Sequence, residues 1–118
     1  MAIIDFFDRG WRINPKGTAY LQDDRRYSFD EIGELSCRIA NGLLAAGLPK
    51  ETKGAIWSGN DVTAWACTLG LWRANMCWIP VGARNSADEN HYVLDAFDCE
   101  VLFFQKYFAP LIAELNKS

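Results

Sequence analysis

The chain contains 118 residues and carries a formal net charge of −3, from 12 Lys and Arg against 15 Asp and Glu. Half of its residues are hydrophobic and 23% are charged, which argues against intrinsic disorder and favours one folded domain of ordinary size. The slightly acidic balance lacks the clustered Lys and Arg that a nucleic-acid surface needs, so we expect no nucleic-acid partner.

The sequence is unlike that of an exported or membrane protein. Its start has no basic stretch and contains acids within the first eight residues, so we expect no signal peptide. The longest apolar stretches, Ala64–Trp72 and Met76–Val81, are far shorter than the roughly 20 residues that cross a bilayer. His91 is the only imidazole and the cysteines form no C-x-x-C pair, so we expect buried, reduced thiols in a cytoplasmic protein rather than a zinc site. The cysteines are Cys37, Cys67, Cys77 and Cys99.

The N-terminal third predicts a helix, a hairpin and a second helix. Residues 3–14 place apolar side chains on one helical face, and Pro15 ends this helix. A short hairpin follows, with strands at 18–22 and 26–28 around a turn at 23–25. Ser28 and Glu31 then form a capping box that opens a helix over 29–46, which Gly47 ends in a left-handed conformation. The face of the first helix comprises Ile3, Phe6, Phe7 and Trp11; that of the second comprises Ile32, Leu35, Ile39, Leu43 and Leu44.

The remainder predicts an α/β fold with a parallel sheet. Short apolar strands begin at residues 54, 77 and 100 and alternate with helices, as in a βαβαβ unit with right-handed crossovers. Asn60 is the expected cap of the first of these helices, which runs to about Ala74, and Ser86 opens a second capping box with Glu89. A last helix is expected within Phe108–Asn116.

No short motif points to catalysis. Residues 58–61 lie between a strand and a helix, where phosphates often bind, but they hold one glycine and no following lysine, so a capped helix start is the simpler interpretation. The acidic pairs Asp23–Asp24 and Asp88–Glu89 fit a turn and a first helical turn. The serines 28, 58 and 86 lack a G-x-S-x-G context, and with His91 as the only imidazole a nucleophilic triad is not supported.

The basic and aromatic residues also favour structural roles. The basic residues Arg9, Arg12 and Lys16 and the pair Arg25–Arg26 are interleaved with acids, which is typical of a solvated surface. Five tryptophans are unusual in so short a chain. Trp65 and Trp72 share a helical face, and Trp57 and Trp78 lie in adjacent expected strands, so core packing is the simplest explanation. Some of the tryptophans could instead pack against a neighbour that this chain does not contain.

The order of these elements resembles the adenylate-forming acyl-CoA synthetase family, the AMP-dependent synthetases and ligases. Residues 27–32 are similar to its T-Y-x-E-L helix start, and the resemblance extends over about residues 3–105. Two positions depart from it: Asn75 replaces the usual glycine before a strand, and Gly54 is shifted from the Gly-Asp turn. The further matching segments are 38–48, 53–56, 60–61, 69–81, 89–97 and 101–103.

The resemblance implies a mechanism that this chain cannot complete by itself. In the family, a small carboxylic acid attacks ATP to give acyl-AMP, and a thiol, usually that of CoA, takes the acyl group, with Mg²⁺ required. The phosphate loop and the catalytic lysine and acids of the family lie beyond the matched segment. We therefore assign no catalytic, cofactor-binding or metal-binding residue here. Lys106 follows the third strand, where some relatives place basic residues near the CoA phosphate. The lysines without a family counterpart are Lys16, Lys50, Lys53, Lys106 and Lys117.

The resulting hypothesis is that residues 1–118 form the N-terminal part of an adenylation domain. They would divide into a hairpin and long helix, 15–48, and a βαβαβ unit, 53–105. The rest of that domain would be the partner, and an exposed sheet edge would allow self-association. We expect this chain to be inactive alone. The alternative is a small α/β binding or interaction module derived from such a ligase; an autonomous nucleotide-binding enzyme is disfavoured because the phosphate loop is absent.

Overall fold

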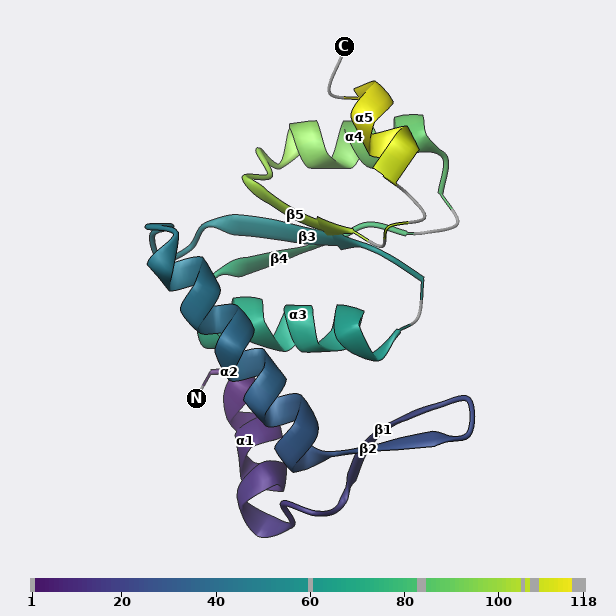
Figure 1. Ribbon diagram of the computed structural model, residues 1–118. Coiled ribbons are helices and arrows are strands. Elements are labelled where there is room, and N and C mark those ends of the chain that lie inside the picture. Colours follow the sequence, from purple (N-terminus) through teal and green to yellow (C-terminus); the bar gives the residue numbers. More distant parts are fainter. Residues whose placement is uncertain (1, 60, 83–84, 105, 107–108, 116–118) are drawn as a thin grey trace.

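The computed structural model describes residues 2–59, 61–82, 85–104, 106 and 109–115. These residues form helices and strands in the predicted order, so the α/β fold class is confirmed (Figure 1). None of the helices in this part of the chain is long and apolar enough to cross a membrane. The elements are α1 (Ile4–Ile13), β1 (Thr18–Gln22), β2 (Arg25–Ser28), α2 (Phe29–Ala45), β3 (Lys53–Trp57), α3 (Val62–Arg73), β4 (Cys77–Pro80), α4 (Ala87–Ala96), β5 (Val101–Phe104) and α5 (Ala109–Leu115).

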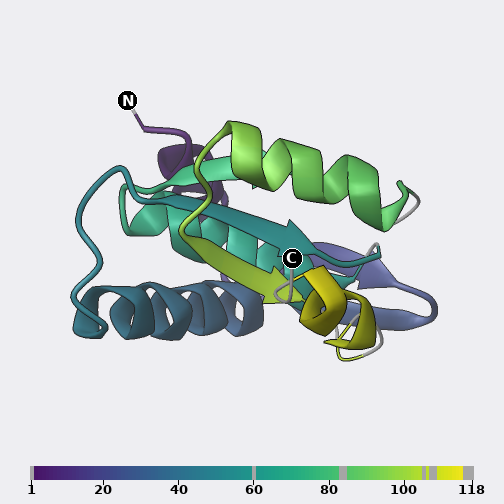
Figure 2. The ribbon, with the colours of Figure 1, turned by 90° about the horizontal axis from the view of Figure 1, so that it is seen from above.

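The sheet of the C-terminal part has three parallel strands in the order β4-β3-β5. The connection from β3 to β4 carries α3 across one face, and the connection from β4 to β5 carries α4 across the other (Figures 1 and 2). The first connection moves from β3 to β4 on one side, and the second moves back past β3 to β5 on the other side. Right-handed crossovers in these two directions place their helices on opposite faces of the sheet. The antiparallel hairpin β1–β2 stands apart from this sheet, below α3 in Figure 1.

Helix α3 lies at the centre of the hydrophobic interior. One face of α3 packs with α2 against the sheet. Leu71 is fully buried there, in the same cluster as Ile56 of β3. The opposite face of α3 packs on α1 and the start of α2 through Ala66, Phe7 and Ile32. Two clusters therefore stabilise the same helix, which explains why its apolar residues are spread around it instead of forming one stripe.

Two glycines let the helices approach closely. A Cβ atom at Gly70 of α3 would lie 2.5 Å from Cγ2 of Ile39 in α2, and one at Gly33 of α2 would lie 2.5 Å from the Trp11 ring in α1. Real Cβ contacts are longer than this, so both positions exclude a side chain. Helices α1, α2 and α3 are therefore held in close contact.

The local signals at both ends of α2 are confirmed. Helix α2 starts at the Ser28–Glu31 capping box, and Gly47 follows its end with φ +80°. Asn75, which takes the place of a glycine in the family resemblance, has φ +61°. Asn tolerates this left-handed conformation better than most residues, so the departure preserves the turn before β4.

The predicted apolar face of the first helix is partly wrong. Ile4 and Phe7 are buried, whereas Ile3 is 58% exposed and Phe6 is 67% exposed. The prediction placed residue 3 on the buried side because it is apolar, but the helix begins at Ile4 and its α2-facing stripe runs through residues 4, 7 and 11. The expected turn at 23–25 is also one residue too long, because Arg25 already pairs with Gln22 in the hairpin.

The tryptophans and cysteines divide between the interior and the surface. Trp57 is 1% exposed in β3, while Trp78 in the edge strand β4 is 43% exposed and meets Trp72 edge to face. All four cysteines are free, and Cys67 is buried with its pKa raised to about 11 because burial disfavours the thiolate. Cys77 is exposed, which corrects the expectation that the thiols are buried.

Candidate functional site

The carboxyl edge of the sheet is the first candidate site. After β3 the chain turns towards α3, and after the adjacent strand β4 it turns towards α4 on the other face (Figures 1 and 2). Ligands of open α/β sheets bind in the crevice that such diverging connections create. Here a cavity of about 270 Å³ lies beside Ser58 and the α3 side of β4, and one of about 230 Å³ lies between Ser58 and the end of β5.

The smaller cavity is lined mainly by apolar surface, whereas polar and apolar surface contribute about equally to the larger one. Ile56, Ser58, Asp61 and Ala64 border both of them. The larger cavity is also lined by Tyr20, Gly59, Trp65, Thr68, Trp78 and Val81, and the smaller by Thr63, Cys67, Phe103 and Phe104. The hydroxyl of Thr68 donates to the carbonyl of Ala64 and that of Ser58 to the carbonyl of Gly59, so neither hydroxyl is free to donate to a ligand.

The N-terminus of α3 does not fit a phosphate. Asp61 is its N-cap: its Oδ2 accepts the backbone N–H of Thr63 at 3.0 Å, and its Oδ1 accepts Nε2 of Gln22 at 3.0 Å. Oε1 of Gln22 in turn accepts the backbone N–H of Val62 at 2.8 Å. Two backbone donors of the first turn are therefore occupied, and a carboxylate stands beside them. The capped helix start is confirmed as the better interpretation of residues 58–61.

The predicted cap of this helix, however, is wrong by one residue. The sequence favoured Asn60, which lies outside the described residues, and the observed cap is Asp61. Asp61 has extended backbone angles, φ −149° and ψ 146°, and immediately precedes the first helical residue, so its carboxylate reaches the next turn. Gln22 was not identified from the sequence, because nothing local connects the hairpin to a helix end 40 residues later.

The N-terminus of α4 is also capped. Ser86 and Glu89 form the predicted capping box, which confirms a structural role for the acidic first turn of this helix. Asn90 is fully buried, and its Nδ2 donates to the carbonyl of Gly82 at 2.9 Å, which ties α4 to the end of β4. Asn85 completes this junction by donating to Oδ1 of Asn90 at 3.3 Å.

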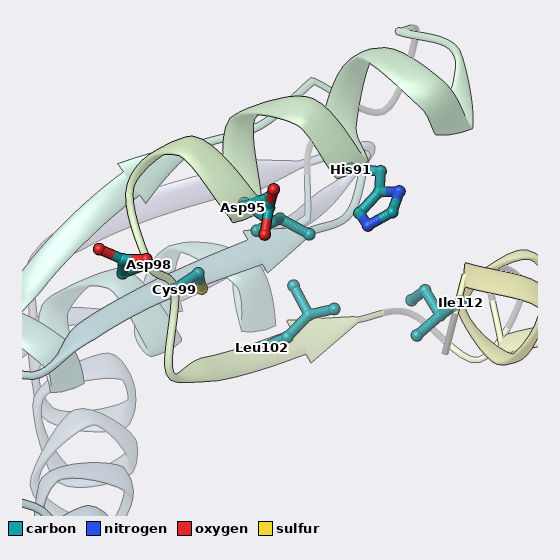
Figure 3. Close-up of a pocket in the computed structure, with 7 residues that line it drawn as sticks. His91, Asp95, Asp98, Cys99, Leu102 and Ile112 are labelled. Atoms are coloured by element: carbon teal, nitrogen blue, oxygen red, sulfur yellow. The ribbon is translucent and has the colours of Figure 1, made fainter. Parts of the chain in front are cut away.

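A larger cavity of about 410 Å³ lies between α4, β5 and α5 (Figure 3). His91 and Asp95 lie along α4 at its border, whereas the Asp98 side chain turns away from them. Burial raises the pKa of the Cys99 thiol, and its Sγ lies 3.1 Å from the carbonyl oxygen of Val101. A protonated, hydrogen-bonded thiol is a poor nucleophile. Among the described residues no three His, Cys, Asp or Glu side chains are placed to share a metal ion.

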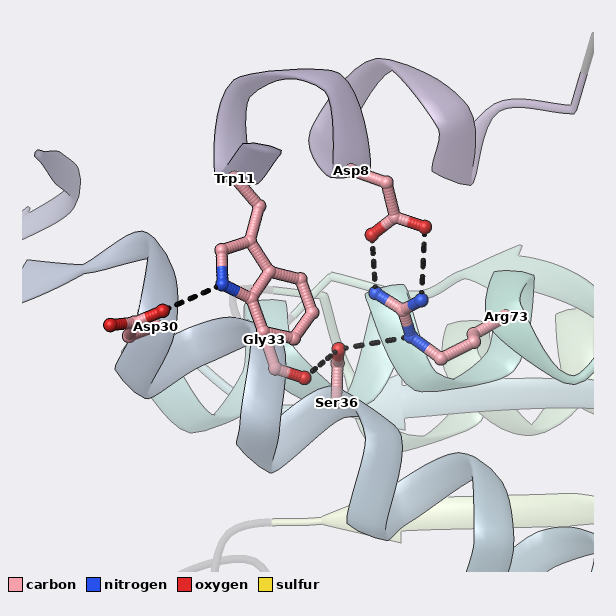
Figure 4. A network of polar contacts seen from close by, with 6 residues as sticks. All are labelled: Asp8, Trp11, Asp30, Gly33, Ser36 and Arg73. Carbon is pink, nitrogen blue, oxygen red and sulfur yellow. Dashed lines mark hydrogen bonds and ion pairs between the residues drawn. The ribbon is translucent and has the colours of Figure 1, made fainter. Parts of the chain in front are cut away.

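A polar network joins α1 to α2 and α3 (Figure 4). Arg73 donates two hydrogen bonds to the Asp8 carboxylate, at 2.8 and 3.0 Å, and Nε of Arg73 donates to Ser36 Oγ at 3.2 Å. The Ser36 hydroxyl donates to the Gly33 carbonyl at 2.7 Å. Partial burial alone would lower the pKa of Arg73, but the hydrogen bonds to Asp8 raise it, so the ion pair is maintained. Every polar partner here is another part of the fold, which indicates a structural clamp.

A second part of this network involves Lys16, which the sequence predicted to lie on a solvated surface. Asp30 accepts Nε1 of Trp11 at 2.8 Å and pairs with Lys16 at 2.8 Å. The hydrogen bonds from Lys16 and Trp11 lower the pKa of Asp30. Arg9 and Arg12 are exposed, as predicted for a solvated surface. The structure therefore places none of the predicted charged clusters around a common reaction centre within the described residues.

Comparison with known proteins assigns the chain to a family. Its residues 7–118 match the family described as AMP-binding enzyme. The chain belongs to the AMP-binding enzyme family. It is 31% identical over 88 residues to the human mitochondrial medium-chain acyl-CoA ligase ACSF2, which covers 75% of this chain and 14% of that protein. It is 26% identical to the 4-hydroxybenzoate–CoA/benzoate–CoA ligase of Rhodopseudomonas palustris, covering 96% of this chain and 21% of that protein.

The fold of this member of the AMP-binding enzyme family is also found within a larger domain. The N-terminal domain of FACL13 from Mycobacterium tuberculosis superposes with a TM-score of 0.88 at 23% identity, covering 100% of this chain and 30% of that one. The chain thus spans less than a third of the length of each of these proteins. The three-stranded sheet with its hairpin is a partial adenylation fold, as the sequence resemblance implied.

Proposed function

We propose that this chain is a structural N-terminal portion of an AMP-forming acid–thiol ligase. The complete enzyme would join a small carboxylic acid to CoA in two steps, through acyl-AMP made from ATP in the presence of Mg²⁺. In this proposal residues 1–118 form one part of the adenylation domain, with the hairpin and long helix at 15–48 and the βαβαβ unit at 53–105. The complete enzyme would act in the cytoplasm on a soluble acid.

One observation carries this proposal: the sheet is narrow and incompletely covered. Each of β4 and β5 has a single neighbouring strand among the described residues, and α4 buries only Asn90 of its ten residues. Tyr92 on α4 is 75% exposed and Phe97 at its end is 57% exposed. A helix that crosses a parallel sheet normally buries an apolar stripe. The rest of a longer adenylation domain would supply the cover that α4 and the strand edges lack.

We expect no ATP or Mg²⁺ site among the described residues. At the start of α3 the N–H groups of Val62 and Thr63 donate to Gln22 and Asp61, and at α4 the capping box occupies the N–H groups of Ser86 and Glu89. No group of metal ligands is assembled in this part of the chain. We therefore expect those ligands to bind elsewhere in the complete enzyme. Lys106 is exposed beyond β5, and its contact with CoA stays a prediction.

Calorimetric titration with MgATP tests this proposal directly. The isolated chain is expected to release no binding heat and to unfold at the same temperature with or without the nucleotide, because nothing in it holds a triphosphate. The full-length benzoate–CoA ligase of R. palustris serves as the positive control. Saturable MgATP binding by the 118-residue chain would contradict the proposal.

The interaction-module alternative has one observation in its favour. The N-terminal half is well packed, with two core clusters on α3 and the Asp8–Arg73 clamp, so this region has the features of a self-sufficient fold. The module hypothesis and the larger-domain hypothesis predict different amounts of exposed apolar surface. A module of this kind would bind little of a hydrophobic dye such as ANS, whereas a segment of a larger domain, with α4 uncovered, would bind it strongly.

A further inference from the structure

Helix α1 has a second apolar stripe that faces away from the fold. Its inner side packs on α2 and α3. On its outer side Ile3 is 58% exposed, Phe6 is 67% exposed and Ile13 is 72% exposed. With 3.6 residues per turn, these three positions share one side of the helix, away from the buried side. A surface helix normally carries polar residues there, so this stripe, which we name the outer face of α1, indicates a docking surface.

The proposed function assigns no occupant to the outer face of α1. In that proposal the rest of the adenylation domain covers α4 and the edges of the sheet. Helix α1 lies on the far side of α3 from the sheet and from α4 (Figure 1). A partner on the outer face of α1 is therefore compatible with that cover and does not depend on it.

Charged residues border this face, with an acid near one end and bases towards the other. Asp5, Arg9 and Arg12 are exposed and recur at helical spacing, so they lie along one side of the apolar stripe. Asp5 accepts the backbone N–H of Ala2 at 2.9 Å, and neither arginine has an ion-pair partner among the described residues. Two such helices side by side attract each other when antiparallel, because the acidic end of each then meets the basic end of the other. A parallel pair would bring like charges together.

We propose that the outer face of α1 binds the same face of a second copy of this chain, antiparallel about a two-fold axis near Asp8. In this register Ile3 faces Ile13 of the partner subunit, the two Phe6 rings lie near the middle, and Asp5 lies within one residue of Arg12 of the partner subunit along the axis. The pairing is isologous, because the same face contributes on both sides, so it closes as a dimer. A helix of 10 residues covers less than the roughly 1,200 Å² of a stable complex, so we expect a dissociation constant of about 10–100 μM.

Sedimentation velocity at protein concentrations up to about 1 mM tests whether this face forms a dimer. Phe6→Ser removes the ring at the middle of the contact and is expected to weaken the dimer at least about tenfold. Tyr92→Ser on α4 is the matched control, because it removes a ring that is 75% exposed on a distant helix, and we expect it to leave the dimer unchanged. Circular dichroism establishes that both variants keep the fold, which is expected because both rings are exposed.

Exchange of charges tests the antiparallel register. Asp5→Lys and Arg12→Glu, each alone, turn the two attractive pairs of the dimer into repulsive ones and are expected to weaken it about tenfold. An equal mixture of these two variants restores both attractive pairs in the mixed dimer, so the mixture is expected to associate with the original affinity. Circular dichroism again verifies the fold of each variant, since both altered side chains are exposed.

A chain that is monomeric at every concentration would overturn the inference. So would a Tyr92→Ser variant that weakens association as much as Phe6→Ser, or a mixture of the charge variants that stays as weak as its components. Binding to vesicles of phosphatidylcholine and phosphatidylglycerol that Phe6→Ser abolishes, without a dimer in solution, would place a membrane on this face and would also overturn it. None of these results bears on MgATP binding, which tests the proposed function separately.

Discussion

Removal of the Arg73 guanidinium is expected to weaken the fold strongly. In Arg73→Met, the Asp8 carboxylate loses both of its hydrogen bonds and Ser36 loses a donor. The Arg73 side chain is 19% exposed and that of Asp8 is 35% exposed, so water compensates for part of the loss. Breaking a fully buried ion pair costs about 3–5 kcal/mol, and an exposed pair contributes less than about 1 kcal/mol. We expect about 2 kcal/mol for this partly buried case.

Urea unfolding followed by tryptophan fluorescence measures this loss. Arg9→Met is the matched control, because Arg9 is exposed on the same helix as Asp8, and we expect it to change the free energy of unfolding by less than about 0.5 kcal/mol. A double-mutant cycle with Asp8→Asn isolates the pair, and its coupling energy should exceed about 1 kcal/mol. A loss below about 0.5 kcal/mol for Arg73→Met, or strictly additive effects in the cycle, would refute the clamp.

Three further changes test other parts of the fold by the same unfolding assay. Gly70→Ala places a methyl group 2.5 Å from Ile39 and is expected to cost about 1–3 kcal/mol; an unchanged midpoint would show that the helices are less close. Glu51→Gly relieves a φ of +69° and is expected to stabilise by about 0.5–1 kcal/mol, so any loss would contradict the strain argument. Lys16 lowers the pKa of Asp30, so Asp30 stabilises the fold above its ordinary pKa of 3.8, and this contribution disappears as the pH falls through the lowered value. Asp30→Asn should therefore make stability less dependent on pH below about 4, and equal acid sensitivity in both proteins would exclude this role.

Signals within a few residues of one another were sufficient to predict most of the elements. Both capping boxes and the left-handed Gly47 depend on side chains and backbone conformations inside one or two helical turns, and all three are observed. The strands of the βαβαβ unit were predictable because residues buried on both faces form continuous apolar runs. The resemblance to a family then extended this local information to the whole chain.

Contacts between distant residues could not be predicted in this way. Arg73 meets Asp8 across 65 positions, and Gln22 completes the cap of α3 across 40, and no periodic pattern encodes either partner. The error at Ile3 and Phe6 has a similar origin, because apolar residues surround much of α1 and only tertiary packing selects the face that meets α2. The sequence predicted where the candidate site lies, in the turn after β3. It did not show that Gln22 accepts a backbone N–H there, which only the structure reveals.

The most direct test of the central claim, that this chain is an incomplete part of an AMP-forming ligase, is ATP–pyrophosphate exchange with the purified chain and a set of aromatic and medium-chain carboxylic acids. We predict no acid-dependent exchange at any protein concentration, while the full-length ligase of R. palustris exchanges under the same conditions. Exchange that requires both an acid and the 118-residue chain would contradict the claim.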